Sequence, residues 1–199
     1  MDYTINGVGV GKDPNGFNRD ETYKSNFDKI GNSKENIKVA HNFISAEVCD
    51  LLIDSKGVAK KHNDKFWSDR IFTNDDISNI AKDFRDQIKD FIDIEYGVTV
   101  SSTPPAISSK VPAIISWHPG VDMGLHVDDL GVDEYHIASL IYLNDDFEGG
   151  EISFPTHGIS IKPSKGDLIV FPGNLNYPHK IEPIVSGNRY TVPFWFKYE

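Results

Sequence analysis

The sequence contains a single cysteine, Cys49, in 199 residues. One cysteine excludes an internal disulfide and any cysteine-rich zinc site, and it fits a reducing compartment. No run of apolar residues approaches the roughly 20 needed to cross a bilayer, and the first residues have neither the basic nor the apolar segment of a secretory signal. We therefore expect a cytoplasmic protein with no membrane partner.

Basic residues are also scarce. There are 20 Lys and Arg against 30 Asp and Glu, which gives a formal net charge of −10. Such an acidic surface repels phosphate backbones, so the composition disfavours nucleic acid as a partner. Hydrophobic residues make up 39% and charged residues 25%, as in ordinary globular proteins. The length and composition predict a single domain over residues 1–199.

Within that domain, the first hundred residues divide into two parts. Residues 1–35 are rich in Gly, Asn, Asp and Lys without apolar periodicity, which predicts an irregular arm. Residues 36–100 contain the expected helices and act as a support region. Ser45 is the predicted N-cap of a short helix that ends near Gly57.

A longer helix is predicted after Asn74. Apolar residues recur there at spacings of three and four positions until Gly97, which is typical of an amphipathic helix. Residues 66–72 (FWSDRIF), which precede it, have the aromatic and β-branched composition of a strand.

The pattern changes in residues 101–199. A Ser- and Pro-rich segment, 101–110, is predicted to be a loop, and roughly eight short β-rich segments follow, separated by Gly, Pro, Asn and Asp. No helical crossovers separate these segments, so an antiparallel sandwich or jelly roll is expected rather than a parallel sheet. The predicted fold class is α+β, mainly β, with N-terminal helices packed on one sheet of a jelly roll.

A candidate metal site begins with His126 and Asp128. Side chains two positions apart in a strand point to the same face, so an imidazole and a carboxylate can reach one ion. With seven histidines and many acidic residues in the chain, this pair alone could also arise by chance on a polar surface.

His179 and Arg189 extend the site. Two histidines and one carboxylate form the facial triad of non-haem Fe(II) oxygenases, although a zinc hydrolase could use the same three ligands. The ligand types argue against calcium and magnesium, which prefer oxygen. Arg189 favours the oxygenase, because a fixed guanidinium binds the carboxylate of a dicarboxylic cosubstrate in bidentate fashion.

The region from about His118 to Trp195 resembles the catalytic core of the 2-oxoglutarate/Fe(II) dioxygenases, specifically the prolyl 4-hydroxylase-like branch. The resemblance rests on an ordered set of motifs: His126-Val127-Asp128, Ile141-Tyr142-Leu143-Asn144, Gly149-Gly150-Glu151-Ile152-Ser153-Phe154, Gly166-Asp167-Leu168-Ile169-Val170-Phe171, His179, and Arg189 leading to Trp195. It implies that the jelly roll, residues 101–199, is a double-stranded β-helix that carries the catalytic site.

The resemblance also implies cofactors and roles. Fe(II), 2-oxoglutarate and O2 would be required, with ascorbate as a reductant. His126, Asp128 and His179 would bind Fe(II), and the carboxylate ligand favours hydroxylation over halogenation. The residues implied to contact the cosubstrate are Arg189, which pairs with its distal carboxylate, Tyr142, Thr191 and Trp195.

Two positions depart from the family pattern. His118 stands where relatives carry a tyrosine before a Pro-Gly turn, so we expect His118 to lie near the cosubstrate and to alter its geometry. Arg189 stands where collagen-type prolyl 4-hydroxylases usually have lysine, and it is more similar to oxygen-sensing and microbial relatives. This departure bears on the substrate and leaves the reaction class unaffected.

Three functions from different classes remain open. The favoured one is hydroxylation of a prolyl residue in a peptide or protein, with residues 66–72 and the loop after Asp128 forming an open groove in which Trp67 and Arg70 contact the peptide backbone. The second is hydroxylation of a small metabolite such as a free amino acid, with those segments closing as a lid. The third is a non-enzymatic metal-binding jelly roll, which the complete set of site residues disfavours.

The remaining histidines have no ligand-type partner at a useful spacing. They are His41, His62, His136 and His157. We expect no site role for them, although His136 has the same strand parity as Tyr142.

Overall fold

The computed structural model describes residues 29–55, 75–103, 113–129 and 135–199, and the backbone of short strands at 4–5, 8–9 and 71–72. In this part of the chain the fold is mainly β. The helices are α2 (Ala46–Asp54), α3 (Asp75–Tyr96) and two 3-10 helices, η1 (Lys34–Asn36) and η2 (Pro155–His157). The strands are β1 (Thr4–Ile5), β2 (Val8–Gly9), β3 (Lys38–Ala40), β4 (Ile71–Phe72), β5 (Val100–Thr103), β6 (Ile114–Trp117), β7 (Met123–His126), β8 (Ile137–Tyr142), β9 (Glu148–Gly149), β10 (Ile152–Phe154), β11 (Ile159–Ile161), β12 (Leu168–Pro172), β13 (His179–Ile181), β14 (Ile184–Ser186) and β15 (Arg189–Tyr198).

Both helices expected from the sequence are present. The side chain of Ser45 accepts a hydrogen bond from the backbone N–H of Val48, which confirms the predicted N-cap of α2. Helix α2 ends at Asp54, before the predicted end near Gly57. Gly97 follows α3 with φ +65°, the left-handed conformation that commonly ends a helix.

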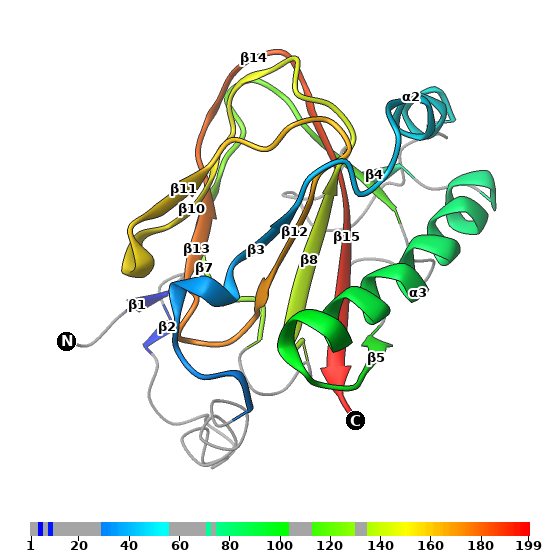
Figure 1. The fold of residues 1–199 in the computed structure, drawn as a ribbon. Coiled ribbons are helices and arrows are strands. Elements are labelled where there is room, and N and C mark those ends of the chain that lie inside the picture. Colours follow the sequence, from blue (N-terminus) through cyan, green and yellow to red (C-terminus); the bar gives the residue numbers. More distant parts are fainter. Residues whose placement is uncertain are drawn as a thin grey trace.

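Most of the described strands form two sheets that face each other, and β1-β2 and β14-β9 form two separate two-stranded sheets. The larger sheet has the order β3-β12-β8-β15-β6-β4, with β5 paired to the end of β15, and the smaller has the order β11-β10-β13-β7. Every described strand pair is antiparallel. Figure 1 shows α2 and α3 on one side of the larger sheet and the smaller sheet on the other. This is a jelly-roll type of arrangement, as the sequence predicted.

Alternation along the strands separates two cores. On β15, Val192, Phe194 and Phe196 face α2 and α3 and are at most 2% exposed. Trp195 lies on the opposite face and packs in the core between the two sheets. Since successive side chains of a strand point to opposite faces, one strand lines a helix-covered core and an inter-sheet core together.

Two predictions require correction. Residues 101–103, expected to lie in a loop, belong to β5 and pair with residues 195–197 of β15. Strand β3 lies where only helical support was expected. The strand predicted at 66–72 is described only at Ile71–Phe72, so Trp67, Arg70 and the proposed groove lie outside the described residues, as does His62.

Asp167 has a structural role in the turn before β12. Its carboxylate accepts hydrogen bonds from the backbone N–H groups of Ser164 at 2.9 Å and Asn42 at 3.2 Å. His41 also contacts it, with 3.0 Å between Nδ1 and Oδ2. The turn before β12 is therefore tied to the segment after β3, which fixes the edge of the larger sheet.

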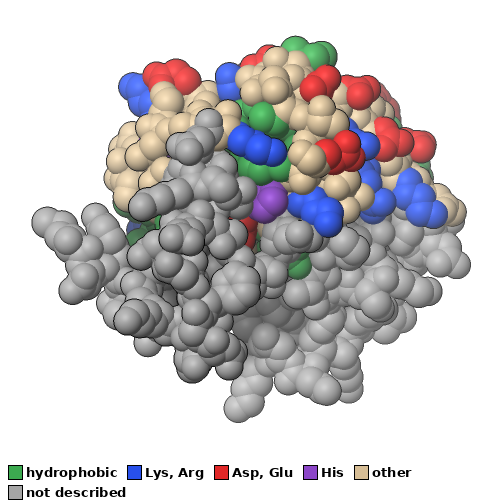
Figure 2. All heavy atoms as spheres, turned by 90° about the horizontal axis from the view of Figure 1, so that it is seen from below, with side chains coloured by type: hydrophobic (Ala, Val, Ile, Leu, Met, Phe, Trp, Pro, Cys, Tyr) green, Lys and Arg blue, Asp and Glu red, His purple; other side chains and the backbone are tan. Residues whose placement is uncertain are grey.

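Figure 2 views the molecule from below. On the described part of this face, acidic and basic side chains are interspersed, with no continuous basic surface. Among the described helices, none combines the length and apolar character needed to span a membrane.

Candidate active site

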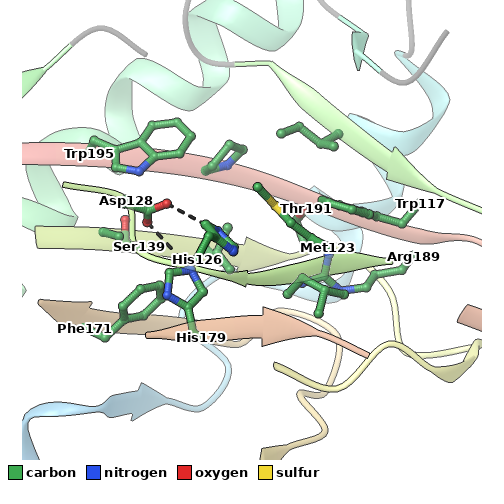
Figure 3. A pocket seen from close by; sticks show the side chains of 15 residues that line it. Trp117, Met123, His126, Asp128, Ser139, Phe171, His179, Arg189, Thr191 and Trp195 are labelled. Carbon is green, nitrogen blue, oxygen red and sulfur yellow. Dashed lines mark ion pairs between the residues drawn. The ribbon is translucent and has the colours of Figure 1, made fainter. Parts of the chain in front are cut away.

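Three predicted ligands converge between the sheets. His126 ends β7, Asp128 follows it, and His179 begins β13; the two histidines are direct partners in the register of these strands. One ligand atom from each residue lies within 4.8 Å of the others. Figure 3 shows the two imidazoles and the carboxylate turned toward one another. Among the described residues, this is the one group of His, Cys, Asp and Glu with such a geometry.

Backbone carbonyls orient both histidine rings. Nδ1 of His126 lies 2.8 Å from the carbonyl oxygen of Gly124, and Nδ1 of His179 lies 3.1 Å from that of Tyr177. Because a carbonyl only accepts, each Nδ1 carries the proton and each Nε2 keeps its lone pair. Both Nε2 atoms face Asp128, at 3.7 Å and 3.9 Å from its oxygens. This donor set fits an Fe(II) ion with three protein ligands.

Burial shifts the pKa values of two of these ligands. Burial raises the pKa of Asp128, and the nearby His126 and the indole of Trp195 oppose this increase. It lowers the pKa of His179 well below its ordinary value, and His126 adds to that shift. Both shifts reflect the cost of a charge in a dry site, which a bound cation would offset for the carboxylate.

Arg189 occupies the same space between the sheets. It is 1% exposed, and its Nη2 donates a hydrogen bond of 2.7 Å to the hydroxyl of Tyr142. The guanidinium carbon lies 4.7 Å from the centre of the Tyr142 ring and 5.5 Å from that of Trp117. Burial raises the pKa of Tyr142, and Arg189 opposes that shift.

The guanidinium of Arg189 has unused hydrogen-bonding capacity. Its Nε is buried without a hydrogen-bond partner, and no carboxylate among the described residues pairs with it. A buried charge without a counterion costs free energy, so its survival in a pocket indicates an anionic ligand. This observation fits the distal carboxylate of a dicarboxylic cosubstrate.

One pocket connects the metal ligands with Arg189. Its cavity volume is about 110 Å³. The predicted residues Thr191 and Trp195 line it, as their strand parity with Arg189 required. Its surface is mostly apolar, with Ile115, Trp117, Met123, Leu140, Phe171 and Ile181 among the lining residues.

His118 is not part of this group. It is exposed, and it does not line the pocket; the preceding residue, Trp117, does. Strand parity explains the difference, because Ile115 and Trp117 on β6 face the pocket and position 118 faces away. The same alternation in residues 114–117 could have predicted from the sequence that Trp117 lines the pocket. Trp117 is the register partner of Arg189.

The other described histidines lie outside the metal-binding group. His41 is exposed and bonds Asp167, and His157 stacks on the ring of Tyr177. His136 stacks on Tyr198, and its Nδ1 accepts a hydrogen bond of 2.8 Å from the backbone of that residue. None of these three belongs to the group formed by His126, Asp128 and His179.

Comparison with known proteins gives the same assignment. Residues 113–197, less than half of the chain, match the model of the 2OG-Fe(II) oxygenase superfamily. The family uses Fe(II), 2-oxoglutarate and O2. The resemblance inferred from the motifs, including its prolyl hydroxylase-like character, is confirmed.

Individual relatives match parts of the chain. Human prolyl 3-hydroxylase 2 is 41% identical over 64 residues, which is 30% of this chain and 9% of that protein. A PKHD-type hydroxylase of Pseudomonas putida KT2440 is 32% identical over 104 residues, 45% of each protein. The chain therefore spans less than half the length of both relatives.

The fold is shared with solved prolyl hydroxylases. The viral collagen prolyl hydroxylase of Paramecium bursaria Chlorella virus 1, in complex with 2-oxoglutarate, superposes with a TM-score of 0.62 at 19% identity. The alignment covers 81% of this chain and 94% of that protein. A match at this identity establishes the fold.

Proposed function

We propose that the protein is a 2-oxoglutarate- and Fe(II)-dependent dioxygenase that hydroxylates an unactivated C–H bond, in a prolyl residue of a peptide or protein. The observation that carries this proposal is the pairing of two features in one pocket. The first is the group of two histidines and one carboxylate, and the second is Arg189, which is buried and pairs with no carboxylate among the described residues. A zinc hydrolase has no use for the second feature.

The metal ligands have defined tasks in this reaction. Fe(II), with 2-oxoglutarate and O2, supplies the oxidising chemistry, in which one oxygen atom enters the substrate C–H bond and 2-oxoglutarate becomes succinate and CO2. His126 and His179 present neutral Nε2 atoms, because their Nδ1 protons are held by backbone carbonyls. Asp128 adds the single negative charge of the ligand set.

The other pocket residues bind the cosubstrate and exclude water. Arg189 pairs with its distal carboxylate, and Tyr142 both orients the guanidinium and offers its hydroxyl to the same carboxylate. Thr191 and Trp195 line the space between this clamp and the metal ligands. The apolar lining keeps the site dry, which strengthens each of these charged interactions.

The prolyl substrate is supported by the kind of relative that matches. Prolyl hydroxylases appear both among the sequence relatives and among the structures that share the fold. We also assign the two facing antiparallel sheets to a double-stranded β-helix, in keeping with that likeness.

The first test is anaerobic titration of the protein with Fe(II) and then 2-oxoglutarate. We expect the weak visible absorption band that develops when 2-oxoglutarate binds protein-held Fe(II). Its absence from folded, iron-loaded protein would refute the proposal. Where the band forms, succinate release with ascorbate present then distinguishes proline-containing peptides from free amino acids.

A further inference from the structure

The hydroxyl of Tyr177 joins two distant parts of the chain. It accepts hydrogen bonds from the backbone N–H of Ser33 at 3.1 Å and the side-chain amide of Asn36 at 2.9 Å. Its own proton faces the carbonyls of Gly31 and Ser33, at 3.0 Å and 3.1 Å. The side chain of Tyr177 is fully buried, and residues 31–36 cover its hydroxyl end. We call residues 31–36 the cap segment.

The ring of Tyr177 is held as firmly as its hydroxyl. The His157 imidazole stacks on it almost in parallel, with ring centres 4.7 Å apart and 8° between the planes. Nε2 of His157 lies 3.2 Å from the side-chain oxygen of Asn32, so the stacked histidine contacts the cap segment too. Little freedom remains for the side chain of Tyr177 once the cap segment is docked.

The backbone of Tyr177 reaches the metal site. Its carbonyl accepts the Nδ1 proton of His179, the interaction that fixes the tautomer and the orientation of that ring. Its N–H donates a hydrogen bond of 2.9 Å to the carbonyl of Asn174, which closes the turn before β13. One residue therefore contacts the cap segment through its side chain and the distal ligand through its main chain.

We propose that Tyr177 is a positioning residue that couples docking of the cap segment to the orientation of His179. Without the hydroxyl contacts the turn at 174–177 gains freedom, and the carbonyl that holds His179 moves with it. Thermodynamic coupling is reciprocal, so a metal bound at His179 should also hold the cap segment in place. This inference rests on the metal site proposed above.

The first experiment compares Mn(II) affinity in wild type, Tyr177→Phe and Tyr96→Phe, measured by the EPR signal of free Mn(II). Tyr177→Phe keeps the ring and removes the hydroxyl; we expect about tenfold weaker binding, as for other partners of metal-ligating histidines. Tyr96→Phe is the control. The Tyr96 hydroxyl bonds the carbonyls of Asn36 in the cap segment (2.7 Å) and of Val170 (3.0 Å), whereas the carbonyl that holds the His179 ring belongs to Tyr177.

Each outcome decides the question. Weaker Mn(II) binding in Tyr177→Phe with unchanged binding in Tyr96→Phe supports the coupling. Equal losses in both variants would mean general destabilisation, and no loss in Tyr177→Phe would mean that the contacts are independent; either result overturns the inference.

Hydrogen exchange of the wild type provides a readout without mutation. Backbone amides of the cap segment, including the Ser33 N–H bound by Tyr177, should exchange several-fold more slowly with Mn(II), whereas amides of α3 should not change. Protection at β7 and β13 without protection of the cap segment would overturn the coupling and leave the metal site intact. No Mn(II) binding by wild type would refute the metal site and the coupling together.

Discussion

The two faces of the larger sheet are made from the same strands and differ in almost every other respect. The face covered by α2 and α3 is mainly apolar, with residues such as Ile141, Val192 and Phe194. The face toward the smaller sheet contains Arg189 and Thr191 as well as aromatic rings. Stability and chemistry are therefore separated by strand parity, not by position along the chain.

The difference has an energetic consequence. Burial of apolar side chains on the helix-covered face stabilises the fold by itself. On the other face, buried charges cost free energy unless they are paired, and the metal and cosubstrate are their natural partners. We therefore expect substitutions on one face to change folding and those on the other to change ligand binding.

The largest effect is expected at the metal ligands. His179→Ala or Asp128→Ala should abolish iron-dependent cosubstrate turnover, because two protein ligands no longer define the site. The fold should remain, as judged by the circular dichroism spectrum and urea midpoint of metal-free protein. A variant that retained full turnover would contradict the metal assignment.

Arg189→Ala should weaken 2-oxoglutarate binding by about 3 kcal/mol, or about a hundredfold, because a buried carboxylate loses its partner. Isothermal titration under anaerobic conditions measures this. Phe194→Leu, on the same strand and the opposite face, is the control. It should lower the free energy of unfolding and leave the affinity unchanged; equal affinity in Arg189→Ala and wild type would refute the clamp.

Adjacent residues on β8 allow a finer comparison. Tyr142→Phe leaves a hydrogen-bond donor of Arg189 unpaired and should weaken 2-oxoglutarate binding by about 2 kcal/mol. Ile141→Val should cost about 1 kcal/mol of unfolding free energy and no affinity. If both variants changed only the affinity, or only the free energy of unfolding, then the two faces of β8 would not separate ligand binding from stability.

The smallest effect concerns pH. The folded-state pKa of His179 is lowered by burial, so below the ordinary histidine value the unfolded chain binds more protons than the folded one. The stability of the metal-free protein should therefore fall as the pH drops below about 6.5, by at most about 1.4 kcal/mol per pH unit. Urea unfolding between pH 7.5 and 5.5 should show this slope in wild type and Ile141→Val but a smaller one in His179→Ala.

Parity also explains how much of the site could be read from the sequence. Thr191 and Trp195 lie in the pocket with Arg189, as their spacing predicted, and their roles remain predictions. His118 was placed by analogy with a family position, and there the alternation of β6 was the better guide, since it points Trp117 inward.

Other features depended on contacts that local patterns do not report. Strand β5 has the composition of a loop, and its strand conformation follows from pairing with the end of β15. The contact between Tyr177 and the cap segment joins residues more than 140 positions apart. The sequence around the cap segment has no apolar periodicity that could have predicted this contact. Capping and amphipathic signals, by contrast, are local, and both predicted helices were found.

Strand β15 has a further consequence for how this protein can change over evolution. It runs without a break from Arg189 to Tyr198 and pairs with β8, β6 and β5. Insertion or deletion of a single residue within it would turn every later side chain to the other face, placing Trp195 under the helices and Phe194 in the pocket. Length changes in this strand should therefore survive only in pairs, whereas substitutions can accumulate one at a time.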